Sequence, residues 1–135
     1  MALLEKFIRS KEFNKLKYLI NEGKNLKIFG IYKGIYPILL ESLLNLERPI
    51  LWITNNDENL TLCEDLKNKI DILETFPSYV HLPYEKPLRS VQKEGKRLRV
   101  LTDLLLNPNH TVIASLKSLI YPLTSKYKLS NNFIV

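Results

Sequence analysis

Apolar residues recur at spacings of three and four positions at the start of the chain, and this pattern predicts two amphipathic helices. The first is defined by Leu3, Leu4, Phe7 and Ile8 and the second by Phe13, Leu16 and Ile20. Asn21-Glu22-Gly23 then provides a polar, glycine-containing end for the second helix. The lysines of these helices are balanced by Glu5, Glu12 and Glu22, as expected of a helix face exposed to water.

Three longer helices are predicted from the same spacing. They run from about Tyr36 to Leu46, from the capping segment Asn55-Asn56-Asp57 to about Lys69, and from about Val91 to Leu106. The residues expected to face inward are Leu39, Leu40, Leu43 and Leu44 in the first, Leu60, Cys63, Leu66 and Ile70 in the second, and Val91, Leu98, Leu101 and Leu105 in the third. A short helix is expected after Ser115, which caps it, and Pro122 stops it.

Continuous apolar runs bounded by turn residues predict strands that are buried on both faces of a parallel sheet. The runs are Leu26 to Phe29, Pro49 to Thr54, a segment within Asp71 to His81 that Pro77 interrupts, and His110 to Ala114. Trp52 lies in the middle of the second run, so we expect its indole ring to belong to the core.

Helices that alternate with buried strands predict a single α/β domain over residues 1–135, with a doubly wound, mostly parallel sheet that has helices on both faces. A chain of this length is large enough to bury a stable core. Residues Asn131 to Val135 have the pattern of a further strand with no turn after it. We therefore expect the chain to be an N-terminal fragment of a larger, multidomain protein.

Composition excludes several classes of protein. Apolar residues make up 45% of the chain and charged residues 25%, which is typical of a globular protein, and no run approaches the ~18 apolar residues of a membrane span. The start of the chain has no signal-peptide pattern, so a cytoplasmic location is expected. The single cysteine, Cys63, and the separated His81 and His110 suggest neither a zinc site nor a catalytic triad. We therefore predict no catalytic residue, no metal ligand and no bound cofactor.

The turn from Gly30 to Pro37 lies where a nucleotide-binding α/β domain has its phosphate-binding loop. A Walker loop has the pattern G-x-x-x-x-G-K-[ST], in which backbone N–H groups surround the phosphates, the lysine contacts the outer phosphates and the hydroxyl binds magnesium. Gly30 and Gly34 have a different spacing, and no Lys-Ser or Lys-Thr pair follows them. Pro37 still suits the first turn of a helix. The segment is predicted to begin a helix but not to bind MgATP.

The net charge of +6 favours an anionic partner where the positive residues are clustered. The densest cluster lies within residues 85–99. Its candidates for contact with DNA, or with another domain of a parent protein, are Arg89, Lys93, Lys96, Arg97 and Arg99. A short row of cations would bind DNA weakly and without sequence preference. A helix face exposed to water has the same pattern, and the sequence does not separate the two interpretations.

Three segments resemble the N-terminal domain of the bacterial transcription-repair coupling factors (Mfd), which is similar in fold to the N-terminal part of the excision-repair protein UvrB. They are Leu82-Pro83-Tyr84 followed by Glu85, the pair Arg97-Leu98 at the family's spacing, and Thr111 to Leu123, which reads TVIASLKSLIYPL. The resemblance covers roughly the last third of the chain. In the earlier part, the order of helices and strands agrees with the family better than the residue types do. It implies a degenerate, helicase-like P-loop fold of the UvrB domain 1a type. It also gives Arg97, which precedes the inward Leu98, the alternative of pairing with a carboxylate of the fold.

What the resemblance implies is a non-catalytic module of an ATP-dependent DNA translocase, which displaces stalled RNA polymerase and recruits nucleotide excision repair. The motor of this family lies in a part that the chain does not contain, and the ATP site that UvrB keeps is lost in the family's N-terminal module. Twelve residues separate Tyr84 from Arg97, too few for the DNA-opening hairpin of UvrB. The implied partners are other domains of the parent, and RNA polymerase and UvrA through parts absent from this chain. Weak, non-specific DNA binding is the only further contact expected, and no membrane is involved.

A small α/β enzyme or nucleotide-binding protein unrelated to repair is the alternative. Such a protein needs polar residues at the carboxyl ends of its strands. The expected ends offer Gly30, Thr54-Asn55-Asn56-Asp57, Tyr84-Glu85 and Ser115. Asp57 and Glu85 are suited to an acid–base pair, but Asp57 is better explained as a helix cap, so we rank this alternative below the first.

Overall fold

The computed structural model describes residues 2–56, 60, 66, 73–78 and 91–133. It divides the chain that we expected to form one domain into two compact units, Met1–Arg48 and Pro49–Val135. The first unit contains helices, and the second combines helices with a parallel sheet. The predicted mixed α/β class is therefore confirmed. The doubly wound architecture and the single domain stay predictions.

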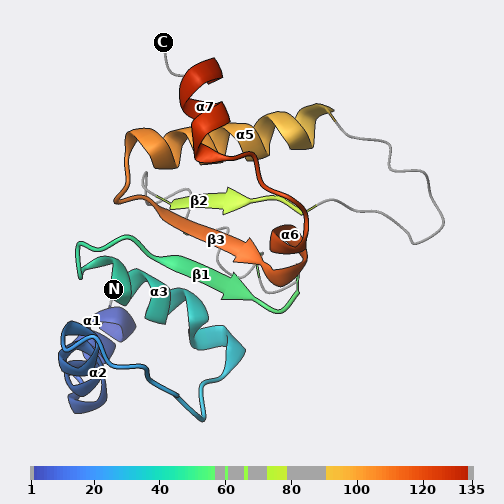
Figure 1. Ribbon diagram of the computed structural model, residues 1–135. Helices are drawn as coiled ribbons and strands as arrows, with labels where there is room; N and C mark the ends of the chain where they lie inside the picture. Colours follow the sequence, from blue (N-terminus) through green and yellow to red (C-terminus); the bar gives the residue numbers. More distant parts are fainter. Residues whose placement is uncertain (1, 57–59, 61–65, 67–72, 79–90, 134–135) are drawn as a thin grey trace. The chain divides into compact units, whose positions relative to one another are not determined.

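The helices of the first unit follow the predicted pattern closely. α1 spans Ala2–Ile8, α2 spans Lys11–Asn21, and a short 3-10 helix, η1 (Lys33–Ile35), leads directly into α3 (Tyr36–Leu44) (Figure 1). The rings of Phe7 and Phe13 lie 5.4 Å apart between their centroids, and Ser10 caps α2 by accepting a hydrogen bond from the Phe13 N–H. Leu39 and Leu40 are the buried apolar residues of α3. Phe13, Leu39 and Leu40 are the buried apolar residues of the first unit.

The strand predicted from Leu26 to Phe29 is wrong. Residues 24–32 form neither helix nor strand, and every residue from 21 to 30 is exposed, including Ile28 and Phe29. A strand needs neighbours that accept and donate its backbone hydrogen bonds, and the described part of the first unit contains no other strand. The apolar run alone therefore does not make a strand at this position.

The second unit is built on three parallel strands, and all three were predicted. β1 spans Leu51–Thr54, β2 spans Leu73–Phe76 and β3 spans Thr111–Ser115, and their order across the sheet is β1-β3-β2. The register places Thr54 beside Ser115 and Phe76 beside Ala114. β2 ends just before Pro77, whose missing N–H does not support a ladder. All five residues of β3 are buried, as expected of a central parallel strand.

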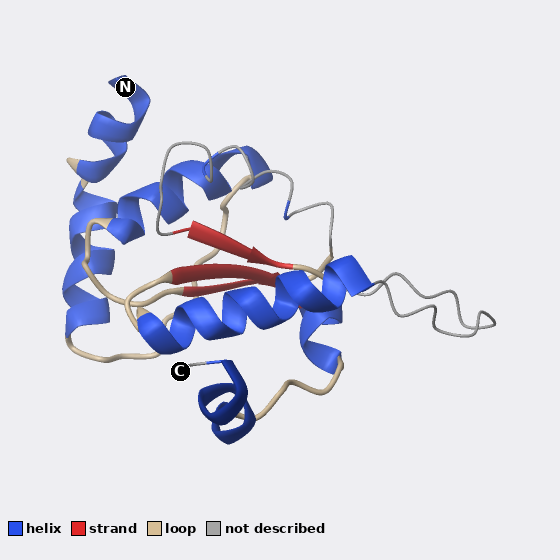
Figure 2. Cartoon of the chain, turned by 90° about the horizontal axis from the view of Figure 1, so that it is seen from above, coloured by secondary structure: helices blue, strands red, loops and turns tan. Residues whose placement is uncertain are grey.

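Helix α5 (Val91–Leu106) packs against β2 and against α7 (Lys126–Phe133), while α6 (Leu116–Ile120) follows β3 directly (Figures 1 and 2). The core beneath α5 consists of Phe76, Val100, Val112 and Ala114, with Leu101, Leu104 and Leu119 packed around it. The buried residues of α5 are Arg97 and Val100. The prediction that Val91 faces inward is wrong, because its side chain is 82% exposed at the start of the helix. Leu98 and Leu105 are half-buried.

β1 is covered less completely than predicted. Leu51 and Ile53 pair with Val112 and Ala114 and share their face of the sheet, yet they are 59% and 51% exposed. Trp52 is half-buried. The prediction of burial on both faces is wrong for β1, because the strand lies at one edge of the three and α5 packs on β2 at the other.

Several remaining predictions fall at the limits of the described residues. The strand expected from Asn131 to Val135 is wrong as far as Phe133, because α7 runs to that residue. Of the helix predicted from 55 to 69, the structure describes Leu60 and Leu66 in its interior, and both are buried. Cys63, His81 and Leu82-Pro83-Tyr84 lie outside the described residues. None of the helices within the described ranges has the length and apolar character needed to cross a membrane.

Candidate functional site

Arg97 lies in the second turn of α5 and is only 4% exposed. Its Nη1 donates hydrogen bonds to the main-chain oxygens of Pro77, at 2.8 Å, and Ser118, at 2.9 Å. The guanidinium carbon also lies 4.2 Å from the centroid of the Phe76 ring, a cation–π contact. One side chain of α5 therefore connects the carboxyl end of β2 to α6.

The burial of Arg97 removes it from the predicted DNA-contacting row. Helical spacing placed Arg97 beside the exposed cations, but α5 is oriented so that Arg97 and Val100 face the sheet. A buried cation is tolerated when hydrogen-bond acceptors replace water around it, and the carbonyl oxygens of Pro77 and Ser118 do so here. Arg97 is therefore a structural residue of the second unit and not a phosphate contact.

Two buried serines fix the turn from β3 into α6. Ser115 is the N-cap residue, and its Oγ accepts a hydrogen bond from the Ser118 N–H at 3.3 Å. The Ser118 hydroxyl donates to the main-chain oxygen of Ser115 at 2.7 Å. Both serines are 0% exposed. The predicted capping role of Ser115 is confirmed.

At the carboxyl edge of the sheet, two hydroxyl residues that the structure describes are used within the fold. Ser115 is buried and used as a cap, and Thr54, also buried, donates its hydroxyl hydrogen to the Asn56 oxygen at 2.9 Å. Asp57 and Glu85, the acid–base candidates, lie outside the described residues. Within the described ranges, no three His, Cys, Asp or Glu side chains are grouped so that they could hold a metal ion.

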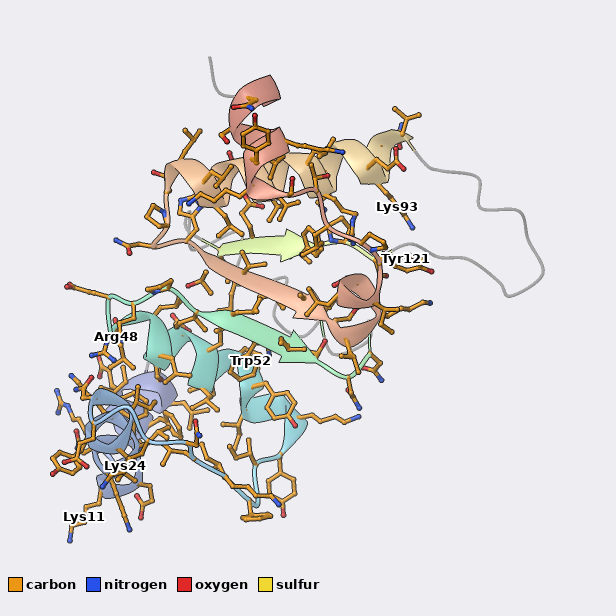
Figure 3. The ribbon with its side chains drawn as sticks, in the orientation of Figure 1. Lys11, Lys24, Arg48, Trp52, Lys93 and Tyr121 are labelled. Atoms are coloured by element: carbon orange, nitrogen blue, oxygen red, sulfur yellow. The ribbon has the colours of Figure 1, made fainter. Side chains whose placement is uncertain are left out.

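The cations of α5 that remain accessible are Lys93, Lys96 and Arg99. Lys93 is half-buried near the start of the helix (Figure 3), and Lys96 and Arg99 are exposed. Arg99 Nε lies 3.7 Å from Asp103 Oδ2, one helical turn further on, so part of its charge is compensated. Arg89, the fifth predicted residue, lies outside the described residues.

Helix α7 adds two lysines that the sequence analysis missed. α7 packs against α5, and its Lys126 and Lys128 are exposed. We use the term α5–α7 basic surface for the accessible cations of these two packed helices, which are Lys93, Lys96, Arg99, Lys126 and Lys128. The two lysines were missed because the cations were counted within one continuous segment, whereas α7 lies about thirty residues further along the chain. A prediction that α7 is a helix docked on α5 would have been needed to find them.

The turn before α3 uses two of its backbone N–H groups locally. The Ile35 N–H donates to the Tyr32 oxygen at 2.9 Å, and the Tyr36 N–H donates to the Lys33 oxygen. Pro37, which follows, has no N–H and lies in the first turn of α3 as predicted. A phosphate cradle requires several N–H groups directed at one anion. This turn has the geometry of a helix start.

Comparison of the chain with protein-family models, with curated proteins and with solved structures found no match.

Proposed function

We propose that this chain is a non-catalytic module of a transcription-repair coupling factor, an ATP-dependent DNA translocase of the bacterial cytoplasm. In such a protein the module is a scaffold for the other domains, while parts outside this chain displace stalled RNA polymerase and recruit UvrA. The proposal includes the finer, doubly wound architecture of the UvrB domain 1a type. It gives the chain itself no catalytic residue and no cofactor.

The observation that carries the proposal is the position of Arg97. Two of the segments that resemble the family are Arg97-Leu98 and Thr111 to Leu123, and they meet through the hydrogen bond from Arg97 to the Ser118 oxygen. The same side chain reaches back to Pro77. This contact gives a structural reason for the number of residues between the two segments, because α5 must be placed so that its buried cation lies between β2 and α6.

The turn before α3 supports the non-catalytic part of the proposal. Its Ile35 and Tyr36 N–H groups are engaged within the turn, and no Lys-Ser or Lys-Thr pair follows its glycines. We expect a titration with a fluorescent ATP analogue to show no saturable binding. Binding at micromolar concentration that requires magnesium would contradict the proposal.

The role in repair is tested by removing the region that encodes residues 1–135 from its natural gene. We expect the preferential repair of the transcribed strand after ultraviolet damage to be lost or reduced, while repair of the other strand is unchanged. Equal strand preference in the deletion and the parent would reject the assignment to a coupling factor. Immunoblotting for the shortened protein separates this outcome from simple loss of expression.

The α5–α7 basic surface gives the module a weak affinity for duplex DNA in this proposal. The test is the double charge reversal Lys93→Glu with Lys96→Glu, measured by fluorescence anisotropy at low and moderate salt. We expect an affinity that does not depend on the DNA sequence, falls steeply as the salt concentration rises and is weakened by the double charge reversal. The matched control is Lys11→Glu with Lys15→Glu, two exposed residues of α2. If both variants bind as the parent does, the surface has no role in DNA binding.

A further inference from the structure

Residues 24–32, with the sequence KNLKIFGIY, form an open segment between α2 and η1, which begins at Lys33 (Figure 1). Two aromatic side chains are almost fully exposed on it: Phe29 is 78% and Tyr32 is 79% exposed. Ile28, next to Phe29, is 50% exposed. Large aromatic side chains are ordinarily buried, and a group of them on the surface marks a contact with a partner.

The charge of this segment indicates that the partner is an anion. Lys24, Lys27 and Lys33 are exposed, and no acidic residue occurs from Gly23 to Leu40. Lys24 (Figure 3) pairs with Glu22 at 2.8 Å, which leaves Lys27 and Lys33 on either side of the two rings. The Lys27 ammonium lies 5.2 Å from the centroid of the Phe29 ring. The cation therefore lies over one face of an aromatic ring that is itself 78% exposed.

We propose that residues 27–33 bind single-stranded nucleic acid, with Phe29 and Tyr32 stacking on bases and Lys27 and Lys33 pairing with phosphates. Exposed aromatic rings beside cations are the combination that proteins use to bind single strands without sequence preference. Gly30, between the rings, has a φ of +77°, a conformation that glycine adopts readily. The two ring-bearing residues are three positions apart, so their Cα atoms are separated by at most about 10 Å and both rings fall within reach of one short strand.

A single strand fits this segment better than a duplex, because bases within a duplex are already stacked on one another and show proteins only their edges. The inference does not depend on the family assignment, and it concerns residues of the first unit rather than the α5–α7 basic surface. An anionic membrane is the competing partner, since it also attracts lysines and accepts aromatic side chains.

The test is the affinity of the full chain for a labelled oligothymidylate of about 15 nucleotides, measured by fluorescence anisotropy. We expect Phe29→Ala with Tyr32→Ala to weaken binding about tenfold or more, the loss typical of removing two base stacks. Phe29→Trp with Tyr32→Trp should retain the affinity, because tryptophan also stacks. Lys27→Glu with Lys33→Glu should weaken binding and make it less dependent on salt. An oligouridylate of the same length shows whether RNA and DNA are bound alike.

Lys11→Glu with Lys15→Glu, at two exposed residues of α2, is the charge-matched control, and we expect it to leave the affinity for oligothymidylate unchanged. Equal binding by the parent and the double alanine variant would overturn the proposal, as would loss of oligothymidylate binding in the control. A third contradicting result is sedimentation with phosphatidylglycerol vesicles that requires Phe29 and Tyr32 while oligothymidylate binding does not. That result would assign the segment to a membrane surface.

Discussion

Helices α3 and α6 start in different ways. α6 follows directly on β3, and its first turn is capped by Ser115, a fully buried residue. α3 follows an open segment and η1, and its N-cap residue, Ile35, makes no side-chain hydrogen bond to the helix. A Cβ atom added at Gly30 or Gly34 would meet nothing within 4 Å. At the start of α6 the capping serines, Ser115 and Ser118, are thus buried in protein, whereas the approach to α3 is open to solvent.

The difference lies in what holds each start in place. Arg97 reaches the Ser118 oxygen from a neighbouring helix, so the start of α6 depends on tertiary contacts. The start of α3 depends on hydrogen bonds between residues three positions apart, such as Ile35 to Tyr32. The first arrangement stabilises a fold, and the second leaves backbone and side chains accessible to a partner. Substitutions at the two starts should therefore differ in what they change.

The largest effect is expected at Arg97. Arg97→Ala removes two hydrogen bonds from a charged donor and leaves the partly buried Pro77 oxygen and the buried Ser118 oxygen without this partner, so we expect the free energy of unfolding to fall by about 3 kcal/mol. The measurement is urea denaturation followed by circular dichroism. Arg99→Ala is the matched control on the same helix, and its exposed side chain should change stability by less than about 0.5 kcal/mol. Similar losses in both variants would show that the start of α6 does not depend on Arg97.

A smaller effect is expected at the cap itself. Ser115→Ala removes the acceptor for the Ser118 N–H in a buried turn, and we expect a loss of about 1.5 kcal/mol. Ser125 has the same role for the Lys128 N–H at 3.4 Å, but it is exposed, so Ser125→Ala should cost only a few tenths of a kcal/mol because water replaces the cap. Thermal unfolding of the two variants compares them directly. If Ser125→Ala proves the more destabilising, burial is not what strengthens the cap.

The open approach to α3 contains a pair of glycines that serve as controls for each other. Gly30 has a φ of +77°, which disfavours any residue with a Cβ, so we expect Gly30→Ala to lower stability by about 1 kcal/mol. Gly34 has no such requirement and lies within η1, so Gly34→Ala should be neutral or slightly stabilising. Urea denaturation of both variants separates them. Equal effects would mean that the positive φ of Gly30 is not maintained in solution.

The smallest effect is expected where the open segment begins. The hydrogen bond from Lys24, and then that from Tyr18, holds the pKa of Glu22 below its ordinary value of 4.5. A lowered pKa means that the ionised carboxylate stabilises the folded state above that ordinary value, and that this contribution disappears as the pH falls through the folded-state pKa. Glu22→Gln should therefore lower the urea midpoint slightly at about pH 7 and leave it unchanged at about pH 3. A difference that grows in acid would contradict this linkage.

The local sequence was sufficient to predict where an element begins or ends when a capping residue or a proline stands at that position. Ser115 and Pro122 bracket the short helix, and Pro77 limits β2, so these features were predicted correctly. The extent of α5 was also correct, but the face it turns inward was not. Helical spacing assigns a cation to the solvent side by default, and only the carbonyl oxygens of Pro77 and Ser118, distant in sequence, make Arg97 an inward residue.

The candidate sites were harder to predict than the helix and strand ends, because they too depend on contacts between residues that are distant in sequence. The open segment was mistaken for a strand because Leu26 to Phe29 has the composition of one, while a strand also requires a neighbour that composition does not reveal. Lys126 and Lys128 were missed because the docking of α7 on α5 is a tertiary contact. That the turn from Gly30 to Pro37 does not bind MgATP stays a prediction, and it rests only on residue types at fixed spacing.

The strand order β1-β3-β2 has a consequence for the order in which the second unit is made. β3 lies between the other two strands but comes last in the chain, so neither β1 nor β2 has its partner until β3 has left the ribosome. β2, α5 and β3 are consecutive elements and contain the core residues Phe76, Val100 and Val112, so they are suited to assemble together first. β1 is synthesised first, so it is without its partner strand for the longest time, and Leu51 and Ile53 are exposed during that time. During synthesis this strand is therefore the part of the unit with the longest opportunity to meet a chaperone.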